Sequence, residues 1–139
     1  VGHSAGGQLA VCAVARLGAQ TARTRITTVV AQSAALDLVA AGQAGRESVR
    51  ALIGASYADA PARYRAASPI EQDIFDAHVV AVHGDRDTAI PVEVSRHYVE
   101  VVGSRGQSAE LIEVPEEGHD VFVDPRSVGN RQTMRVLGI

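Results

Sequence analysis

The sequence predicts an α/β fold in which helices cover a mostly parallel β-sheet. Short β-branched, apolar segments at 26–31, 78–82 and 109–114 are typical of strands, and helical patterns separate them. Strands separated by helices pair in parallel, because a helical crossover returns the chain to the same end of the sheet. The 139 residues are the usual size of one domain, and no repeat or linker divides them.

A helix is expected over residues 6–18. Leu9, Ala13 and Leu17 recur at the spacing of one helix face, with Ala10 and Val14 beside them, which predicts that this side of the helix is buried. Gly18 is suited to end the helix, since glycine readily adopts the left-handed backbone of a C-terminal cap.

Glycines and prolines divide the remaining helical sequence into shorter pieces. The alanine-rich region after the first strand predicts helices near 46–53 and 61–66, and another helix is expected over 92–102. Asp124 followed by Pro125 is typical of an N-cap and a first helical residue, so the last helix is predicted to begin there.

Composition and charge argue against several classes of function. The formal net charge is −3, which gives no electrostatic basis for binding nucleic acid or an anionic membrane surface. The single cysteine, Cys12, excludes an intrachain disulfide and a multi-cysteine zinc site, and we expect it to be a small core residue. The histidines show no chelating spacing, and no apolar run is long enough to cross a bilayer. We therefore expect no metal, no cofactor, no nucleic-acid partner and no membrane partner.

The segment from Gly2 to Gly6 fits the pattern G-x-S-x-G, with a further glycine behind it. In this pattern a serine lies at the tip of a sharp strand-to-helix turn, where its hydroxyl is exposed. Small neighbours are needed because the turn is strained and passes close to other backbone. Ser4 is therefore a candidate nucleophile, and the N–H of Ala5 at the helix N-terminus is a candidate oxyanion donor. A flexible turn before a helix is the alternative reading.

A second candidate element is the acidic loop at residues 83–91, directly after the predicted strand 78–82. A carboxylate in such a loop can accept a hydrogen bond from an imidazole and fix its tautomer. Asp87 is the preferred acid because it lies further into the loop, whereas Asp85 at the strand exit is suited to cap the turn. His83, which ends the strand, is expected to make a structural hydrogen bond.

The third candidate element is His119, which follows Gly118 in the loop after the last predicted strand. A histidine at that place can reach the end of the sheet and act as a general base. Ser4, Asp87 and His119 each follow a predicted strand, and they occur in the order nucleophile, acid, base. Three such elements in this order are far less expected by chance than any one of them.

Together these segments make the chain resemble the C-terminal half of an α/β-hydrolase, of the esterase and prolyl-oligopeptidase-like kind. The matching segments are GHSAGG at 2–7, HGDRDTAIP at 83–91, with Ile90 where valine is usual, GH at 118–119, Ser68-Pro69 and Val123-Asp124-Pro125. The resemblance implies a three-layer α/β/α sandwich, with Ser4 as nucleophile, Asp87 as acid and His119 as base. It implies no cofactor.

Relatives of this kind also have strands before the nucleophile and an upstream HGGG-type loop that supplies a second oxyanion donor. Neither is found here, so we expect residues 1–139 to be a partial domain without its N-terminal strands. The strand leading into Ser4 is expected to be absent. A sheet without those neighbours exposes an apolar edge, and the chain alone is expected to be poorly stable or inactive.

The expected activity is hydrolysis of a carboxylic ester through an acyl-Ser4 intermediate, with a small-molecule ester or a short peptide as the binding partner. A peptidase or an arylformamidase of the same fold is the alternative, and a non-catalytic protein that keeps the fold is another. His3 is expected to pack in the turn. Tyr57 and Tyr64 are expected either to line the acyl pocket or to pack in the core.

Overall fold

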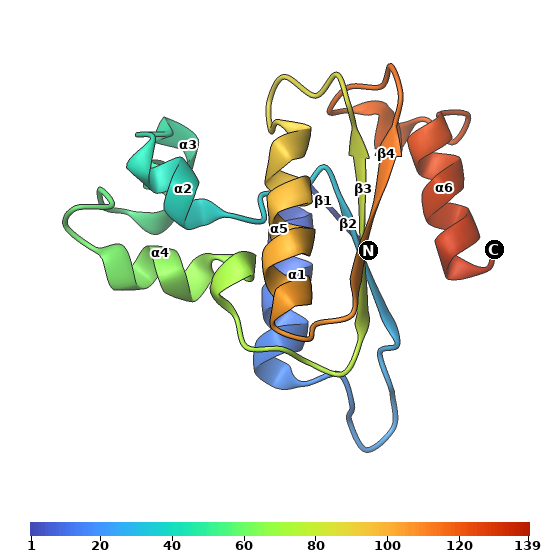
Figure 1. Cartoon of the computed structure of the whole chain (residues 1–139), viewed down its shortest axis with the longest axis horizontal. Helices are drawn as coiled ribbons and strands as arrows, with labels where there is room; N and C mark the ends of the chain where they lie inside the picture. Colours follow the sequence, from blue (N-terminus) through green and yellow to red (C-terminus); the bar gives the residue numbers. More distant parts are fainter.

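A four-stranded parallel sheet runs through the middle of the molecule in the computed structural model, which describes residues 1–139 (Figure 1). The strands are β1 (Gly2–His3), β2 (Thr28–Gln32), β3 (His78–Gly84) and β4 (Ala109–Val114), in the spatial order β1-β2-β3-β4. Every neighbouring pair is parallel, as the sequence predicts. The expectation that the strand before Ser4 is absent is wrong, because two residues of it pair with the end of β2.

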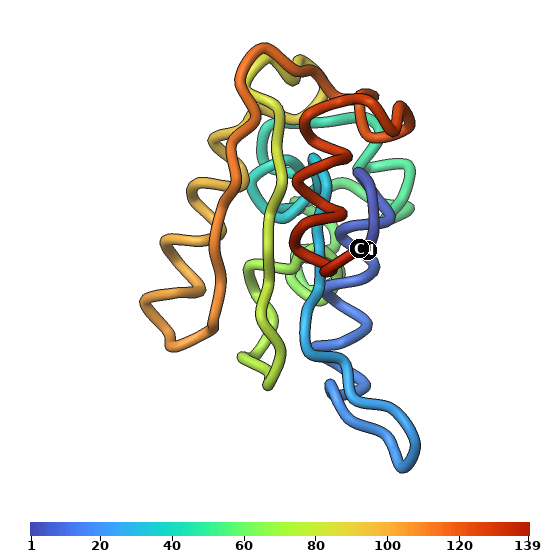
Figure 2. The backbone as a smooth tube through the Cα atoms, turned by 90° about the vertical axis from the view of Figure 1, so that its right-hand side faces the viewer, coloured from blue at the N-terminus to red at the C-terminus, as the bar shows by residue number.

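Three long helices cover the two faces of this sheet. Helices α1 (Ala5–Leu17) and α5 (Val92–Ser104) lie on one face and α6 (Val128–Leu137) on the other, which gives the expected three layers (Figures 1 and 2). None of the helices combines the length and the apolar character that crossing a membrane requires.

Three short helices form an excursion between β2 and β3 on the side of α1 and α5 (Figure 1). They are α2 (Leu38–Gln43), α3 (Glu47–Ile53) and α4 (Pro61–Ala67), and the last two confirm the predicted pieces within one residue. Tyr64 of α4 is buried, donates its hydroxyl hydrogen to the carbonyl of Ala55 at 2.7 Å, and packs edge-on against Tyr57. Both tyrosines are therefore packing residues of this excursion.

The core forms on both faces because the middle of each of the two central strands, β2 and β3, is a continuous apolar run. Val79 and Ala81 of β3 belong to a cluster of 13 buried residues that packs against α1 and α5. Val80 and Val82 alternate with them and belong to a smaller cluster under α6. Successive side chains of a strand point to opposite faces, so a continuous apolar run is what a sheet buried on both sides needs.

The inner face of α1 differs in part from the predicted one, since Val14 is buried and Ala10 packs against the core as expected, but the two leucines do not. Leu9 and Leu17 are 65% and 82% exposed, whereas Gly7, Val11 and Val14 are buried against the sheet. Most positions of this helix are small or apolar, so periodicity alone suits more than one face. A Cβ on Gly7 would lie 2.5 Å from the Cβ of Ala34, so α1 packs too closely for leucine to face the sheet. Gly18 ends the helix with φ +83°, as predicted.

The start of α6 also differs, because the helix begins at Val128 and Ser127 is its N-cap. The Ser127 hydroxyl accepts a hydrogen bond from the N–H of Asn130 at 3.0 Å. Asp124 instead accepts a hydrogen bond from the N–H of Arg126, within a separate turn. Asp124 and Pro125 therefore form that turn and not the start of the helix, which begins three residues later than predicted.

We expect Ser127→Ala to lower the free energy of unfolding by about 1 kcal/mol, because the N–H of Asn130 loses its partner. Asp124→Ala, in the turn before it, is the control, and its effect is expected to be at most about 0.5 kcal/mol. Urea unfolding of both variants measures the difference. A larger loss at Asp124 than at Ser127 would contradict this assignment of the cap.

Candidate active site

Ser4 lies at the tip of a strained turn between β1 and α1. Its φ of +53° is unusual for a residue with a side chain, and the turn is held by a hydrogen bond from its N–H to the carbonyl of Gln32 at 2.8 Å. A Cβ on Gly2 would lie 2.2 Å from the carbonyl oxygen of Gly6, so only glycine fits there. A Cβ on Gly6 itself would meet nothing within 4 Å. The close approaches that make this turn possible are therefore at Gly2 and Gly7.

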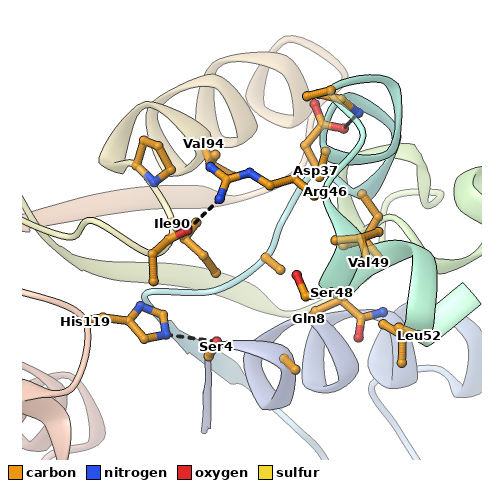
Figure 3. A pocket seen from close by; sticks show the side chains of 18 residues that line it. Ser4, Gln8, Asp37, Arg46, Ser48, Val49, Leu52, Ile90, Val94 and His119 are labelled. Carbon is orange, nitrogen blue, oxygen red and sulfur yellow. Dashed lines mark hydrogen bonds between the residues drawn. The ribbon is translucent and has the colours of Figure 1, made fainter.

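The structure brings the three predicted site residues together at the carboxyl ends of the strands. The hydroxyl of Ser4 lies 3.0 Å from Nε2 of His119, and Nδ1 of His119 lies 2.7 Å from Oδ2 of Asp87 (Figure 3 shows the first of these contacts). A carboxylate only accepts, so Nδ1 of His119 carries the hydrogen and Nε2 accepts from the hydroxyl of Ser4. Asp85 makes no hydrogen bond with His119 and instead accepts the N–H of Glu116 at 2.6 Å.

Asp87 is buried, and main-chain donors fix its orientation. Its Oδ1 accepts the N–H groups of Ala89 and Ile90 at 2.9 and 2.8 Å, which leaves Oδ2 to face His119. Burial raises the pKa of this carboxyl, but the hydrogen bonds from His119 and Ile90 and the neighbouring Ser33 outweigh burial, so that the pKa lies below its usual value. Asp87 is therefore ionised at neutral pH.

His83 is fully buried beside this carboxylate and has a structural role, as predicted. Its Nε2 lies 2.8 Å from the carbonyl of Ile90, so Nε2 carries the hydrogen and Nδ1 accepts from the hydroxyl of Ser95 at 2.7 Å. Burial lowers the pKa of His83, and its contacts with Ile90 and Asp87 offset this only in part. A neutral His83 therefore braces the loop that carries Asp87.

Ser33 is a site residue that the sequence analysis missed. It follows β2 directly, has φ +42° and is completely buried. Its hydroxyl has no partner in hydrogen-bonding geometry, although it lies near enough to Asp87 to lower the pKa of that carboxyl. Its place after a strand end, like the places of Asp87 and His119, is a signal that could have indicated it.

The loops that carry the acid and the base are joined to each other by main-chain hydrogen bonds. The N–H of Asp85 donates to the carbonyl of Val114 at 3.0 Å, and the N–H of Arg86 donates to the carbonyl of Glu117 at 3.0 Å. A Cβ on Gly84 would lie 2.2 Å from the latter oxygen, so the close approach of the loops requires glycine. These hydrogen bonds therefore hold the loop of Asp87 against the loop of His119.

The base loop is also anchored to the opposite layer. The carboxylate of Glu117 accepts the N–H groups of Val128 and Gly129, at 2.6 and 2.8 Å, at the first turn of α6. An acidic group at this end of a helix satisfies free N–H groups and is favoured by the helix dipole. Helix α6 therefore helps to position the residues before His119.

His3 makes a contact with the base loop that the sequence gives no means to predict. Its Nε2 lies 2.7 Å from the carbonyl oxygen of His119, across 116 positions of sequence, and the two rings lie 4.8 Å apart. His3, His119 and Asp120 also offer potential metal ligand atoms within 4.8 Å of one another. Nε2 of His3 and both nitrogens of His119 already take part in hydrogen bonds, which account for this cluster without a metal.

A pocket of about 550 Å³ opens beside Ser4 and His119 (Figure 3). The N–H of Ala5 borders this pocket and donates no hydrogen bond within the chain, so it is free to bind an oxyanion. Helices α2 and α3 supply one wall, and the acid loop and α5 supply another. Most of the lining residues are apolar, among them Ala35, Leu38, Ala41, Val49, Ile90 and Val94.

A parallel sheet with helices on both faces, and a serine in the turn from a strand to a helix, define the α/β-hydrolase fold. The profile of the prolyl oligopeptidase family matches residues 1–137, and the chain belongs to that family. A search of curated proteins gives no significant match.

Solved structures of hydrolases share this fold. An esterase from the planctomycete Thermogutta terrifontis superimposes with a TM-score of 0.72 at 21% identity, over 99% of this chain and 51% of the esterase. A truncated carbohydrate esterase from gut microbiota gives 0.68 at 24% identity, over 85% of this chain and 50% of that one. A bifunctional acetyl ester-xyloside hydrolase from Caldicellulosiruptor lactoaceticus gives 0.74 at 19% identity, over 99% and 55%. The chain thus spans about half the length of these structures.

Proposed function

We propose that this chain carries the catalytic triad of a serine hydrolase that cleaves carboxylic esters, with Ser4 as nucleophile, His119 as general base and Asp87 as the orienting acid. The observation that supports this most is the pair of contacts Ser4–His119 and His119–Asp87, at 3.0 and 2.7 Å. Such distances allow a proton to pass from the hydroxyl to the imidazole, while the carboxylate stabilises the imidazolium that forms.

The chemistry follows from these positions in two steps. In the first, Nε2 of His119 takes the hydroxyl proton as Ser4 attacks the ester carbonyl, and the N–H of Ala5 stabilises the oxyanion. The alkoxy group then leaves with the proton from His119, and an acyl-Ser4 ester remains. In the second step, His119 takes a proton from water, the resulting hydroxide attacks the acyl group, and Ser4 leaves with that proton as the free hydroxyl.

The pocket favours an ester with an uncharged acyl or alkoxy group. Of the 18 lining residues 11 are hydrophobic, and they come from α1, α2, α3, α5 and the loops between them, so burial of apolar substrate groups drives binding there. One structure of the Thermogutta esterase has butyrate bound, and another has propionate bound. Short aliphatic acyl esters are therefore the first substrates to test.

A fluorophosphonate probe tests the proposal directly, because it forms a stable adduct only with an activated serine. We expect one adduct per folded molecule, located at Ser4 by peptide mass spectrometry. The Thermogutta esterase is phosphonylated by sarin in one of its structures. Ser48→Ala, which removes an exposed hydroxyl from the same pocket, is the matched control and should label as the wild type does. A folded protein without an adduct on Ser4 would support the non-catalytic alternative.

A peptidase is the second candidate, and the family match is the observation that favours it. The same triad cleaves amides, since His119 would protonate a leaving amine as it does an alcohol. A comparison of p-nitrophenyl butyrate with a prolyl p-nitroanilide separates the two activities when each rate is divided by that of the uncatalysed hydrolysis. A larger rate enhancement for the ester is the result expected from the proposed function.

A further inference from the structure

We propose that His3, the residue before the nucleophile, is a positioning residue for the general base. Its Nε2–H holds the main chain of His119 and so sets the distance between the imidazole and Ser4. The inference rests on the proposed function, because it assigns His3 a part in the same triad.

The hydrogen bond from His3 is the only one made by the main-chain N–H and C=O groups of His119. The carbonyl of His119 accepts from Nε2 of His3 at 2.7 Å, and neither the N–H nor the C=O of His119 takes part in a main-chain hydrogen bond. A carbonyl cannot donate, so Nε2 of His3 carries the hydrogen. Without His3, the main chain of the base would have no polar restraint of its own.

Asp87 alone does not fix the imidazole relative to the nucleophile. It holds Nδ1 of His119, but none of the hydrogen bonds of its carboxylate reaches the turn that carries Ser4. Ser4 lies outside the acid and base loops, in the turn before α1. His3 is joined to Ser4 by one peptide bond, and its hydrogen bond therefore connects the nucleophile's turn directly to the main chain of His119.

The side chain of His3 is itself held in place. The main chain of His3 pairs with that of Gln32 in the sheet, which fixes where the side chain begins. Its ring lies 5.6 Å from the ring of the buried Phe122 and 4.8 Å from that of His119, at tilts of 44° and 48°. Aromatic packing on this scale restrains the ring, so the donor is aimed before substrate arrives.

Two variants separate the hydrogen bond from the packing. His3→Phe keeps a ring against Phe122 and His119 but has no donor. His3→Gln loses the ring but places an amide N–H at nearly the same distance from the main chain as Nε2 of histidine. His3→Asn, which is too short to reach the carbonyl of His119, is a second loss variant without added apolar volume.

The first measurement is the rate of Ser4 phosphonylation as a function of probe concentration, which separates probe binding from the covalent step. We expect the covalent rate constant to fall about 10- to 100-fold in His3→Phe and His3→Asn but to stay within about threefold in His3→Gln, since misplacing a catalytic group by about 1 Å costs rate on this scale. The binding constant for the probe should stay unchanged. A purely structural residue would lower the thermal midpoint without this pattern of rescue.

The second measurement needs no turnover and so distinguishes failure of this inference from failure of the proposed function. The proton between Nδ1 of His119 and Asp87 should give a far-downfield NMR resonance that is sharp in the wild type and in His3→Gln and broadened in His3→Phe. Equal covalent rates and an unchanged resonance in His3→Phe, or a His3→Gln variant that behaves like His3→Phe, would overturn the role of His3. A wild type that shows the resonance but forms no adduct would contradict the proposed function alone.

Discussion

In the intact protein, Ser4→Ala is expected to lower ester turnover by about 10⁶-fold, because removing one member of a triad that acts as a unit costs about as much as removing all of it. The variant keeps Ala5, whose free N–H would still stabilise an oxyanion, but it has no atom to form the acyl intermediate. Steady-state hydrolysis of p-nitrophenyl butyrate measures the loss, and the fluorophosphonate adduct should disappear with it.

The fold should tolerate this substitution well. The hydroxyl of Ser4 makes a hydrogen bond only with His119, whereas the hydrogen bond that holds the turn is made by the main-chain N–H of residue 4 to Gln32. Circular dichroism and urea unfolding of Ser4→Ala should therefore resemble those of the wild type. Near-wild-type turnover in a folded Ser4→Ala variant would show that another residue is the nucleophile.

Asp87→Asn is expected to lower turnover by about 10⁴-fold, the scale seen when the acid of a triad becomes an amide. Main-chain hydrogen bonds fix the orientation of the new amide group. The N–H groups of Ala89 and Ile90 hold the oxygen at the position of Oδ1, so the amide nitrogen faces Nδ1 of His119. Nδ1 must then accept a hydrogen bond, and the hydrogen moves to Nε2, which can no longer accept the proton of Ser4.

Asp85→Asn is the matched control, since it neutralises the other aspartate of the same loop. Asp85 is exposed and accepts the N–H of Glu116, a bond that an amide oxygen can also accept. Its effect on turnover should stay below about tenfold, as expected for a surface change that leaves the triad in place. A greater loss in Asp85→Asn than in Asp87→Asn would show that the acid is assigned to the wrong residue.

Three of the four strands could be predicted from the sequence because they carry a strong β pattern, whereas the two residues of β1 are too few to show one. The segment 78–82 is almost entirely apolar and β-branched, and such a segment between helical stretches indicates a strand that is buried on both faces. Helix α1 shows the opposite case. Its small and apolar residues suit several faces, and the close packing of Gly7 against Ala34, which settles the face, involves residues 27 positions apart and is absent from any local pattern.

The candidate site was predictable to the extent that its residues follow strand ends. Ser4, Asp87 and His119 each leave the sheet at its carboxyl edge, where parallel strands bring their loops together. His3 could not be found in this way, because its hydrogen bond depends on the place that the His119 loop takes 116 residues later. Asp124 was misassigned for a related reason, since a D-P pair caps a turn as readily as a helix.

The hydrogen bonds between the acid and base loops allow the shape of the substrate pocket to change without changing the position of the acid relative to the base. Residues 83–119 carry both Asp87 and His119, and the two loops are linked by main-chain hydrogen bonds whose close approach needs a glycine only at position 84. One wall of the pocket comes from α2 and α3, which lie outside that segment. Substitutions in the excursion 36–68 can therefore change this wall of the pocket without touching the hydrogen bond between Asp87 and His119. Transfer of residues 83–119 from one relative to another would therefore transfer the acid and the base together, in the same relative position.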